Sequence, residues 1–213
     1  MSFWDDQFSV EGYKYGTEPN DFLRLNMHRF KGHGRILLPG DGEGRNGVWL
    51  AEQGFDVVTV DSSSVGIKKT QALARTRGVH VSSIHSDLQY WDSSPESMSF
   101  DGIAIIYLHL PTEIREQIYM KLAECLRPRG TLLIELFHPK QLGRSSGGPK
   151  DLGMLCSLED LRRIFVTAPE NGTTRKASIH FEEILGEEVE TVLDEGPGHQ
   201  GPAMVTRFIG ERV

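Results

Sequence analysis

The chain has 213 residues, a length that fits one domain and buries roughly 70% of the surface that the unfolded chain exposes. Its 30 acidic and 23 basic side chains give a net charge of −7, which argues against a dedicated binder of nucleic acid. The sequence has neither a run of about 18 apolar residues nor a signal-peptide core, and its two cysteines lie far apart. We therefore expect a cytoplasmic protein with reduced thiols.

Residues 1–30 are expected to form N-terminal lid helices, because aromatic side chains alternate there with acids before a second helical pattern begins. These aromatic side chains either pack over the core or contribute to a ligand site. Under the second interpretation Tyr13 and Tyr15 form a wall over the ligand, and Tyr13 is a candidate catalytic residue.

The segment 35–54 predicts a strand, a glycine turn and a helix. Ile36–Leu38 is a short apolar run of the kind that a buried parallel strand shows. Gly40, Gly42 and Gly44 follow it and precede an amphipathic helix pattern. Glycines permit positive φ angles and a close approach of the backbone to a ligand, and a helix N-terminus attracts an anion.

The next expected strand, residues 55–60, ends at Asp61. An acid about twenty residues after a glycine turn typically accepts hydrogen bonds from ribose hydroxyls. The alternative is a plain βαβ unit in which Asp61 caps a helix. Gly42–Gly47 matches the dinucleotide pattern G-x-G-x-x-G, whereas Gly40–Gly44 matches the G-x-G-x-G turn of class I methyltransferases. The turn alone leaves both kinds of adenosine ligand open.

The rest of the chain continues to alternate strands and helices. Residues 62–64 are serines that predict an N-cap for a basic helix ending at Gly78. Further strands are expected at 80–84, 100–110, 131–137, 179–185 and 204–209, with helices at 111–126 and from residue 157 onward. The last two strands have no helix between them, and the chain has no Tyr-x-x-x-Lys pair. This ending favours a methyltransferase sheet over a dehydrogenase domain.

The chain resembles class I S-adenosylmethionine-dependent methyltransferases and, within them, the TehB-like group of tellurite resistance, with thiopurine methyltransferases as more distant relatives. The matching segments are Trp4-Asp5, Tyr15–Pro19, Gly40–Asn46, Asp61–Ser63, Leu126–Gly130 and Gly147–Pro149. Leu38 is a departure, since many members have an acid two residues before the first glycine. The resemblance implies one Rossmann-like α/β domain over 1–213, with its core at 35–213. Its sheet would have seven mostly parallel strands, an antiparallel last strand and helices on both faces.

The resemblance also implies a site for S-adenosylmethionine along the first strands of the sheet. The implied contacts are Gly40, Gly42 and Gly44 at the amino-acid half, Arg45 at its carboxylate, Asp61 at the ribose, Asp87 and Leu88 at the adenine, and Tyr107 and Leu108 near the sulfonium, where electron-rich groups suit a cation. Tyr15, Asp41 and Ser62 lie in the matching segments and complete the expected site. For Arg45 the alternative is a surface salt bridge.

The methyl acceptor is expected to be a small molecule. A sulfur, selenium or tellurium nucleophile needs little help beyond positioning, whereas an alcohol or amine needs a base. His109, His138 and His199 follow strands that end at one edge, so they are candidate bases or else hydrogen-bonded structural residues. Arg144 and Lys150 lie in the glycine-rich segment 138–156, expected to be a substrate-side loop, and suggest an anionic acceptor.

The histidine and cysteine spacing indicates no metal site. Cys125 is expected in the core, while Cys156 follows the long loop and is a candidate for substrate contact. We expect a monomer or homodimer that binds neither nucleic acid nor a membrane. Two other functions stay open: a nicotinamide-dependent oxidoreductase, and a non-catalytic protein that binds the cofactor or a metalloid.

Overall fold

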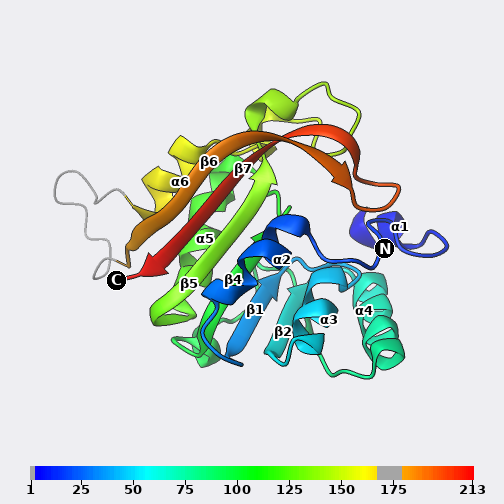
Figure 1. Ribbon diagram of the computed structural model, residues 1–213, viewed down its shortest axis with the longest axis horizontal. Helices are drawn as coiled ribbons and strands as arrows, with labels where there is room; N and C mark the ends of the chain where they lie inside the picture. Colours follow the sequence, from blue (N-terminus) through cyan, green and yellow to red (C-terminus); the bar gives the residue numbers. More distant parts are fainter. Residues whose placement is uncertain (1–2, 167–178) are drawn as a thin grey trace.

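A single sheet runs through the structure, a computed structural model that describes residues 3–166 and 179–213 (Figure 1). The seven strands are ordered β3-β2-β1-β4-β5-β7-β6. They are β1 (Arg35–Pro39), β2 (Asp56–Asp61), β3 (Ser82–His85), β4 (Phe100–Ile106), β5 (Leu126–Phe137), β6 (Phe181–Asp194) and β7 (Gln200–Arg212). The first five pair in parallel, and β7 is antiparallel to its neighbours β5 and β6. The predicted sheet is confirmed.

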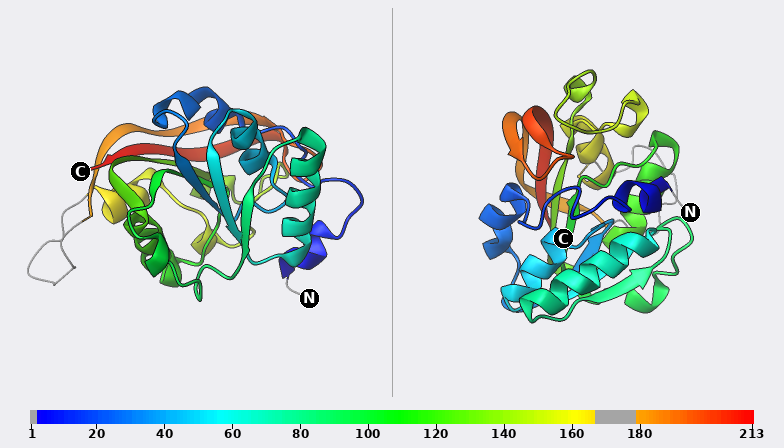
Figure 2. Two further views of the ribbon diagram at one scale, coloured as in Figure 1. Left: turned by 90° about the horizontal axis from the view of Figure 1, so that it is seen from below. Right: turned by 90° about the vertical axis from the view of Figure 1, so that its right-hand side faces the viewer.

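Helices cover both faces of this sheet, as predicted (Figures 1 and 2). They are α1 (Phe3–Phe8), α2 (Asp21–Asn26), α3 (Arg45–Glu52), α4 (Ser64–Arg77), α5 (Thr112–Glu124) and α6 (Leu158–Phe165), with short 3-10 helices η1 (Met27–Arg29), η2 (Ser94–Glu96), η3 (Pro139–Gln141) and η4 (Leu152–Met154). Buried side chains of α2, α3 and α4 form one cluster with the sheet, and those of α5 and α6 form another.

The apolar run of β1 shows why both faces are covered. Ile36 and Leu38 belong to the cluster beneath α2, α3 and α4, whereas Leu37 belongs to the cluster beneath α5 and α6. Successive side chains of a strand point to opposite faces, so a strand with helices on both sides must be apolar at every position. The uninterrupted run in the sequence therefore reflects a central strand.

The expected group of lid helices divides in the structure. Only α1 lies at the carboxyl edge of the sheet (Figure 1). In α2, Phe22 and Leu23 are buried in the same cluster as Ile36 and Leu38. The apolar side chains of α2 therefore pack on the sheet, and α2 is a core helix.

Strand boundaries also differ from the prediction around β4 and β5. The strand expected to reach residue 110 ends at Ile106, because Tyr107 adopts φ 51° and turns the chain out of the sheet. β5 begins at Leu126, earlier than expected, and its pairing with β4 has a register shift near Phe100. The serine-capped helix, in contrast, agrees with the prediction: α4 has Ser63 as its N-cap and Gly78 in left-handed conformation as its C-cap.

Candidate cofactor and acceptor site

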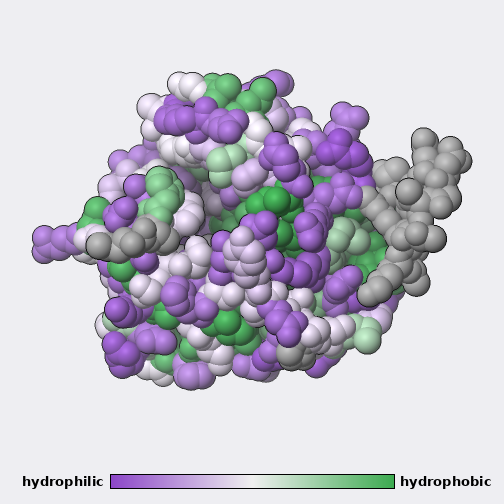
Figure 3. Space-filling model, turned by 180° about the vertical axis from the view of Figure 1, so that it is seen from behind, coloured by the Kyte–Doolittle hydropathy of each residue, from purple (hydrophilic) through white to green (hydrophobic). Residues whose placement is uncertain are grey.

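A cavity of about 870 Å³ lies at the carboxyl ends of the parallel strands. Its wall comes from α1, from the turns after β1, β2 and β3, from the ends of β4 and β5, and from the β6–β7 turn. Its volume is within the range of ligand sites, which is about 300–1,000 Å³. In the space-filling view, apolar side chains show in the hollowed middle of the face opposite to that of Figure 1 (Figure 3).

Most of the site residues predicted from the sequence lie on the wall of this cavity. They are Tyr15, Gly40, Asp41, Gly42, Arg45, Asp61, Ser62, Asp87, Leu88, Tyr107, Leu108, His109, Lys150 and His199. Four others, Tyr13, Gly44, His138 and Arg144, do not line it.

Gly44 and Tyr13 face α4 instead of the cavity. A Cβ at Gly44 would lie 2.8 Å from the backbone Cα of Thr70, so the glycine allows α3 and α4 to pack closely. The hydroxyl of Tyr13 donates to the carbonyl oxygen of Lys69 over 3.4 Å. The alternating glycines thus have two roles. Gly40 and Gly42 line the cavity, whereas Gly44 allows the helices to pack.

His138 and Arg144 are held by contacts elsewhere on the molecule. The Nδ1 atom of His138 accepts a hydrogen bond from the Lys140 N–H (3.0 Å), and its Nε2 lies 3.2 Å from a carboxylate oxygen of Glu188. Both ring nitrogens therefore have partners, one in the η3 turn and one on β6. Arg144 forms an ion pair with Glu190 at 2.5 Å.

Asp61 connects the glycine turn to the start of α4. One carboxylate oxygen accepts from the Gly42 N–H and the other from the Ser63 N–H, each over 2.8 Å. Burial raises the pKa of Asp61, while these two N–H groups oppose the rise. Each carboxylate oxygen has a second lone pair, so this buried acid on the cavity wall can still accept hydrogen bonds from a ligand.

Two buried polar atoms near the glycine turn have no hydrogen-bond partner among the described residues: Nη1 of Arg45 and Oδ1 of Asp41. The other ends of these side chains are fixed, since Arg45 Nη2 donates to Glu195 (3.0 Å) and Asp41 Oδ2 accepts from the Gly47 N–H (3.0 Å). Buried polar atoms are normally paired. A buried donor and a buried acceptor on residues of one cavity wall suit the carboxylate and the ammonium of an α-amino acid.

Farther along the cavity the wall is aromatic. The rings of Tyr107 and Phe137 stack at 4.7 Å, and His199 lies 4.6 Å from the first ring and 5.2 Å from the second. Tyr15 lies 4.5 Å from His199, and His109 lies 5.5 Å from Phe137. We call these five residues the aromatic chamber.

The loop after β5 closes one side of the aromatic chamber through two glycines. A Cβ at Gly147 would lie 2.6 Å from the His199 ring, and a Cβ at Gly148 would lie 2.7 Å from the Phe137 ring. Both glycines have positive φ angles, 123° and 88°. No other residue would let the loop approach these rings so closely.

His109 is held in the chamber by backbone groups on both sides. Its Nδ1 donates to the Met154 carbonyl oxygen (3.1 Å), and its Nε2 accepts a hydrogen bond from the Phe137 N–H (3.5 Å). Burial lowers the pKa of His109 to about 3. The ring is therefore neutral and structural.

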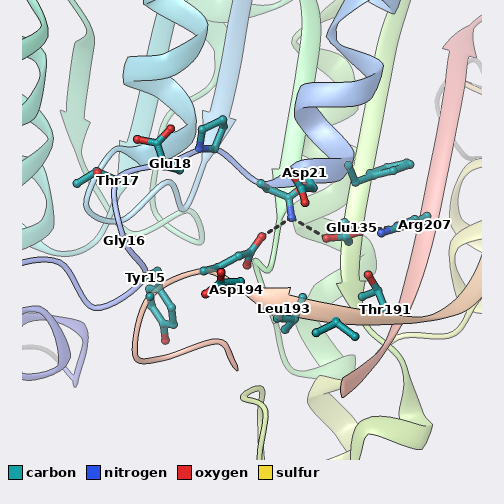
Figure 4. A pocket seen from close by; sticks show the side chains of 16 residues that line it. Tyr15, Gly16, Thr17, Glu18, Asp21, Glu135, Thr191, Leu193, Asp194 and Arg207 are labelled. Carbon is teal, nitrogen blue, oxygen red and sulfur yellow. Dashed lines mark hydrogen bonds and ion pairs between the residues drawn. The ribbon is translucent and has the colours of Figure 1, made fainter. Parts of the chain in front are cut away.

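A buried polar network behind the chamber was not predicted. The amide of Asn20 donates to Glu135 (2.7 Å) and to Glu195 (2.8 Å), as the dashed lines in Figure 4 show. Glu135 also accepts from the Tyr107 hydroxyl (2.8 Å) and pairs with Arg207 (2.5 Å). The one signal in the sequence is Glu135 itself, a single acid within an apolar strand.

The comparisons with known proteins concern the part of the chain that contains the glycine turn. Residues 36–130, from β1 into β5, match the family model of a methyltransferase domain. The chain carries an S-adenosylmethionine-dependent methyltransferase domain. No curated protein matches the sequence significantly.

Many solved structures share the fold of this methyltransferase domain at low identity. One, described with the conversion of a disulfide bond into a thioacetal group during echinomycin biosynthesis, is 15% identical with a TM-score of 0.72, over 98% of this chain and 87% of that one. TehB from Haemophilus influenzae is 16% identical with a TM-score of 0.65, over 89% and 61%. Magnesium protoporphyrin IX methyltransferase from Synechocystis, solved with bound S-adenosylhomocysteine, is 18% identical with a TM-score of 0.61, over 90% and 78%.

The unpaired buried atoms of the methyltransferase domain fit the cofactor. S-Adenosylmethionine ends in an α-amino acid, so Arg45 Nη1 would meet its carboxylate and Asp41 Oδ1 its ammonium. Gly42 has φ 62°, and a Cβ there would lie 2.9 Å from Phe8 of α1. Glycine is therefore required where the turn passes under α1.

Because the carboxyl group of Asp41 is buried, we expect the stability of the protein to depend on pH. Burial raises the pKa of Asp41 from 3.8 to about 7, so the folded protein holds a proton that the unfolded chain releases. The free energy of unfolding should then fall as pH rises from about 4 to about 7, by up to about 4 kcal/mol. In Asp41→Asn this fall should disappear. Urea unfolding of both proteins across that window checks it, and parallel curves would contradict it.

Asp5 attaches α1 to the start of α4. Its Oδ1 atom accepts from the Ser63 hydroxyl (2.8 Å) and from the Val65 N–H (3.2 Å), next to Asp61 in sequence. Trp4 and Phe8 of the same helix line the cavity. A buried acid therefore holds two aromatic side chains of α1 over the site.

Asp5→Ala is expected to release α1. The lost hydrogen bonds to Ser63 and Val65 at the start of α4 should cost about 1 kcal/mol of stability. Hydrogen exchange in residues 3–8 should become faster, and the affinity for S-adenosylhomocysteine should fall. Asp6→Ala, an exposed acid on the same helix, is the matched control. Equal exchange in the two variants would show that Asp5 does not hold the helix.

The cysteines are structural in the described chain. Cys125 and Cys156 are fully buried, and neither lines the cavity. Burial raises the pKa of their thiols to about 11 and about 12. The substrate contact expected for Cys156 is therefore not seen.

Within the described ranges, no His, Cys, Asp and Glu side chains group as a metal site, and no helix is both long and apolar enough to cross a membrane.

Proposed function

We propose that this protein transfers a methyl group from S-adenosylmethionine to a small molecule bound in the aromatic chamber. One observation carries the proposal: a single cavity joins the glycine turn, with its unpaired buried donor and acceptor, to the chamber. The cofactor and the acceptor would then meet inside one space. Its volume of about 870 Å³ lies toward the upper end of the range for ligand sites.

The proposed cofactor contacts follow the cavity wall from one end to the other. Asp87 and Leu88 would meet the adenine, and Asp61 the ribose hydroxyls. Arg45 and Asp41 would hold the amino-acid group. Tyr107 and Leu108, where the chain leaves β4, would lie near the sulfonium. Ser62 and Tyr15 complete the wall.

The bound cofactor would supply a methyl group that is already activated for displacement by its sulfonium. The protein's tasks are to align the acceptor with that group and to exclude water. Trp4 and Phe8 of α1 and the loop at Gly147 and Gly148 are placed for the second task, because they enclose the cavity from two sides.

A TehB-like acceptor is the second candidate. The segments Tyr15–Pro19 and Gly40–Asn46 support it, as does Lys150 on the cavity wall, whose charge suits an anion. A sulfur, selenium or tellurium species would then be methylated, and tellurite resistance would be the outcome in the cell. Arg144 no longer supports an anionic acceptor, because Glu190 neutralises it.

Calorimetry tests the cofactor assignment. We expect S-adenosylhomocysteine to bind in the micromolar range and NADH not to bind. NADH binding without S-adenosylhomocysteine binding would instead support the oxidoreductase alternative. A protein that binds S-adenosylmethionine yet methylates no thiol, tellurite, selenite, phenol or amine would be a non-catalytic binder.

A further inference from the structure

Resting on the proposed function, we propose that Glu195 positions His199 as the general base of the aromatic chamber. We infer in addition that the acceptor carries an O–H or N–H group on an apolar body. Both residues lie in the β6–β7 turn. The sequence indicates a role for His199 but none for Glu195.

The hydrogen bond between the two side chains fixes the state of the ring. Nδ1 of His199 lies 3.1 Å from a carboxylate oxygen of Glu195. A carboxylate only accepts, so Nδ1 carries the proton and Nε2 keeps its lone pair. In the described residues no hydrogen bond reaches Nε2, and His199 lies on the cavity wall. A free basic nitrogen is therefore presented to the chamber.

Glu195 is itself held in place from two other elements. Arg45 of α3 donates to one oxygen (3.0 Å), and Asn20, the N-cap of α2, donates to the other (2.8 Å). Burial by itself would raise the pKa of Glu195, but the hydrogen bond from His199 and the charge of Arg45 lower it to about 2. The carboxylate thus stays ionised and cannot rotate away. It also joins the arginine proposed for the cofactor to the histidine of the chamber.

The surroundings of His199 leave its ring neutral near neutral pH. Burial lowers its pKa, and Glu195 opposes that fall without reversing it. The other groups that face the ring are Arg45 of α3, Glu135 of β5 with its partner Arg207 of β7, the phenols of Tyr15 and Tyr107, and His109 after β4. A neutral imidazole can accept a proton, and the buried carboxylate stabilises the imidazolium that forms.

The other two candidate histidines cannot take this role. His109 and His138 each have both ring nitrogens occupied by partners of the chain. Among the three, only His199 combines an orienting carboxylate with a free nitrogen on the cavity wall.

A base is required only when the acceptor atom still carries its proton at neutral pH, as an alcohol, phenol or amine does. As the acceptor's lone pair forms the bond to the methyl carbon, the carbon–sulfur bond breaks with its electron pair going to sulfur. The acceptor proton passes to Nε2 of His199 and later leaves to water. A thiolate or telluride acceptor has no proton to lose, so it would not need this base.

The apolar body of the acceptor follows from the rest of the wall. Tyr107 and Phe137 present stacked rings, and Leu110, Ile114 and Met154 line the same space. Such a surface gains by covering an apolar or aromatic group.

NMR of the histidine ring nitrogens in the apo-protein tests the positioning. We expect the Nδ1–H tautomer of His199 at about pH 7. In Glu195→Gln the ring should titrate at least about one pH unit lower and lose its tautomer preference. Glu190→Gln, on the exposed side of β6, is the control and should change neither. The Nε2–H tautomer in the wild-type protein would overturn the proposal, and that measurement needs no variant.

Ring shifts in the complex with S-adenosylhomocysteine test the acceptor class. Addition of para-cresol or aniline should shift the His199 signals, whereas tellurite and selenite should not. Shifts with the oxyanions alone, or with none of these probes, would overturn the assignment of the acceptor. Failure of S-adenosylhomocysteine to bind would instead refute the proposed function, while the tautomer of the apo-protein would still be informative about Glu195.

Discussion

Arg45→Met is expected to lower the free energy of unfolding by about 3–5 kcal/mol. The ion pair between Arg45 and Glu195 is buried, since the two side chains are 7% and 10% exposed. Without the guanidinium, Asn20 and His199 are the partners that the carboxylate keeps among the described residues. A buried charge that loses its counter-charge costs far more than a surface pair. Urea unfolding at neutral pH measures this loss.

Arg144→Met is the matched control for Arg45→Met. Its ion pair with Glu190 is shorter, 2.5 Å, but the side chains are 32% and 64% exposed. Water screens such a pair, so its loss should cost less than about 1 kcal/mol. Equal losses in the two variants would show that the Arg45 pair contributes no more than a surface pair.

Arg45→Met also tests whether Arg45 has a structural role alone or binds the cofactor as well. Nη1 of Arg45 has no hydrogen-bond partner among the described residues, and Arg45 lines the cavity. If it pairs with the cofactor carboxylate, Arg45→Met should also weaken S-adenosylhomocysteine binding. A loss of stability with unchanged affinity would remove Arg45 from the cofactor site.

Asp61→Ala should raise the dissociation constant of S-adenosylhomocysteine by about 10- to 100-fold. Hydrogen bonds to a charged partner contribute about 1.5–3 kcal/mol, and about 1.4 kcal/mol is tenfold in affinity. Two effects add: the ribose loses its acceptor, and the N–H groups of Gly42 and Ser63 lose theirs, so the turn loosens.

Asp56→Ala is the control for Asp61→Ala. Asp56 begins the strand that Asp61 ends, and it is exposed, with a long contact of 3.5 Å to Arg35. Calorimetry on the two variants should show a change only for Asp61. Unchanged affinity in Asp61→Ala would refute the assignment of this acid to the ribose.

The part of the site proposed for the cofactor is predictable because its residues lie close together in the sequence. A strand, a glycine turn, a helix and an acid at the end of the next strand follow one another from Ile36 to Asp61. Their spacing alone brings Gly42 and Asp61 into hydrogen-bond contact. Gly44 shows the limit of the motif, because only the packing of Thr70 from α4 explains it.

The part of the site proposed for the acceptor could not be predicted in the same way. Asn20 reaches Glu135 across 115 positions of the sequence and Glu195 across 175. No pattern within one segment reveals such a network. The rule that parallel strands end at one edge brought His109 and His199 together, but it did not reveal that η3 turns His138 away.

A crystal structure of the complex with S-adenosylhomocysteine tests the central claim most directly. We expect the ribose hydroxyls within hydrogen-bond distance of the Asp61 carboxylate and the amino-acid carboxylate on Arg45, with the sulfur facing the aromatic chamber. A ribose bound elsewhere, or a sulfur that points away from the chamber, would contradict it.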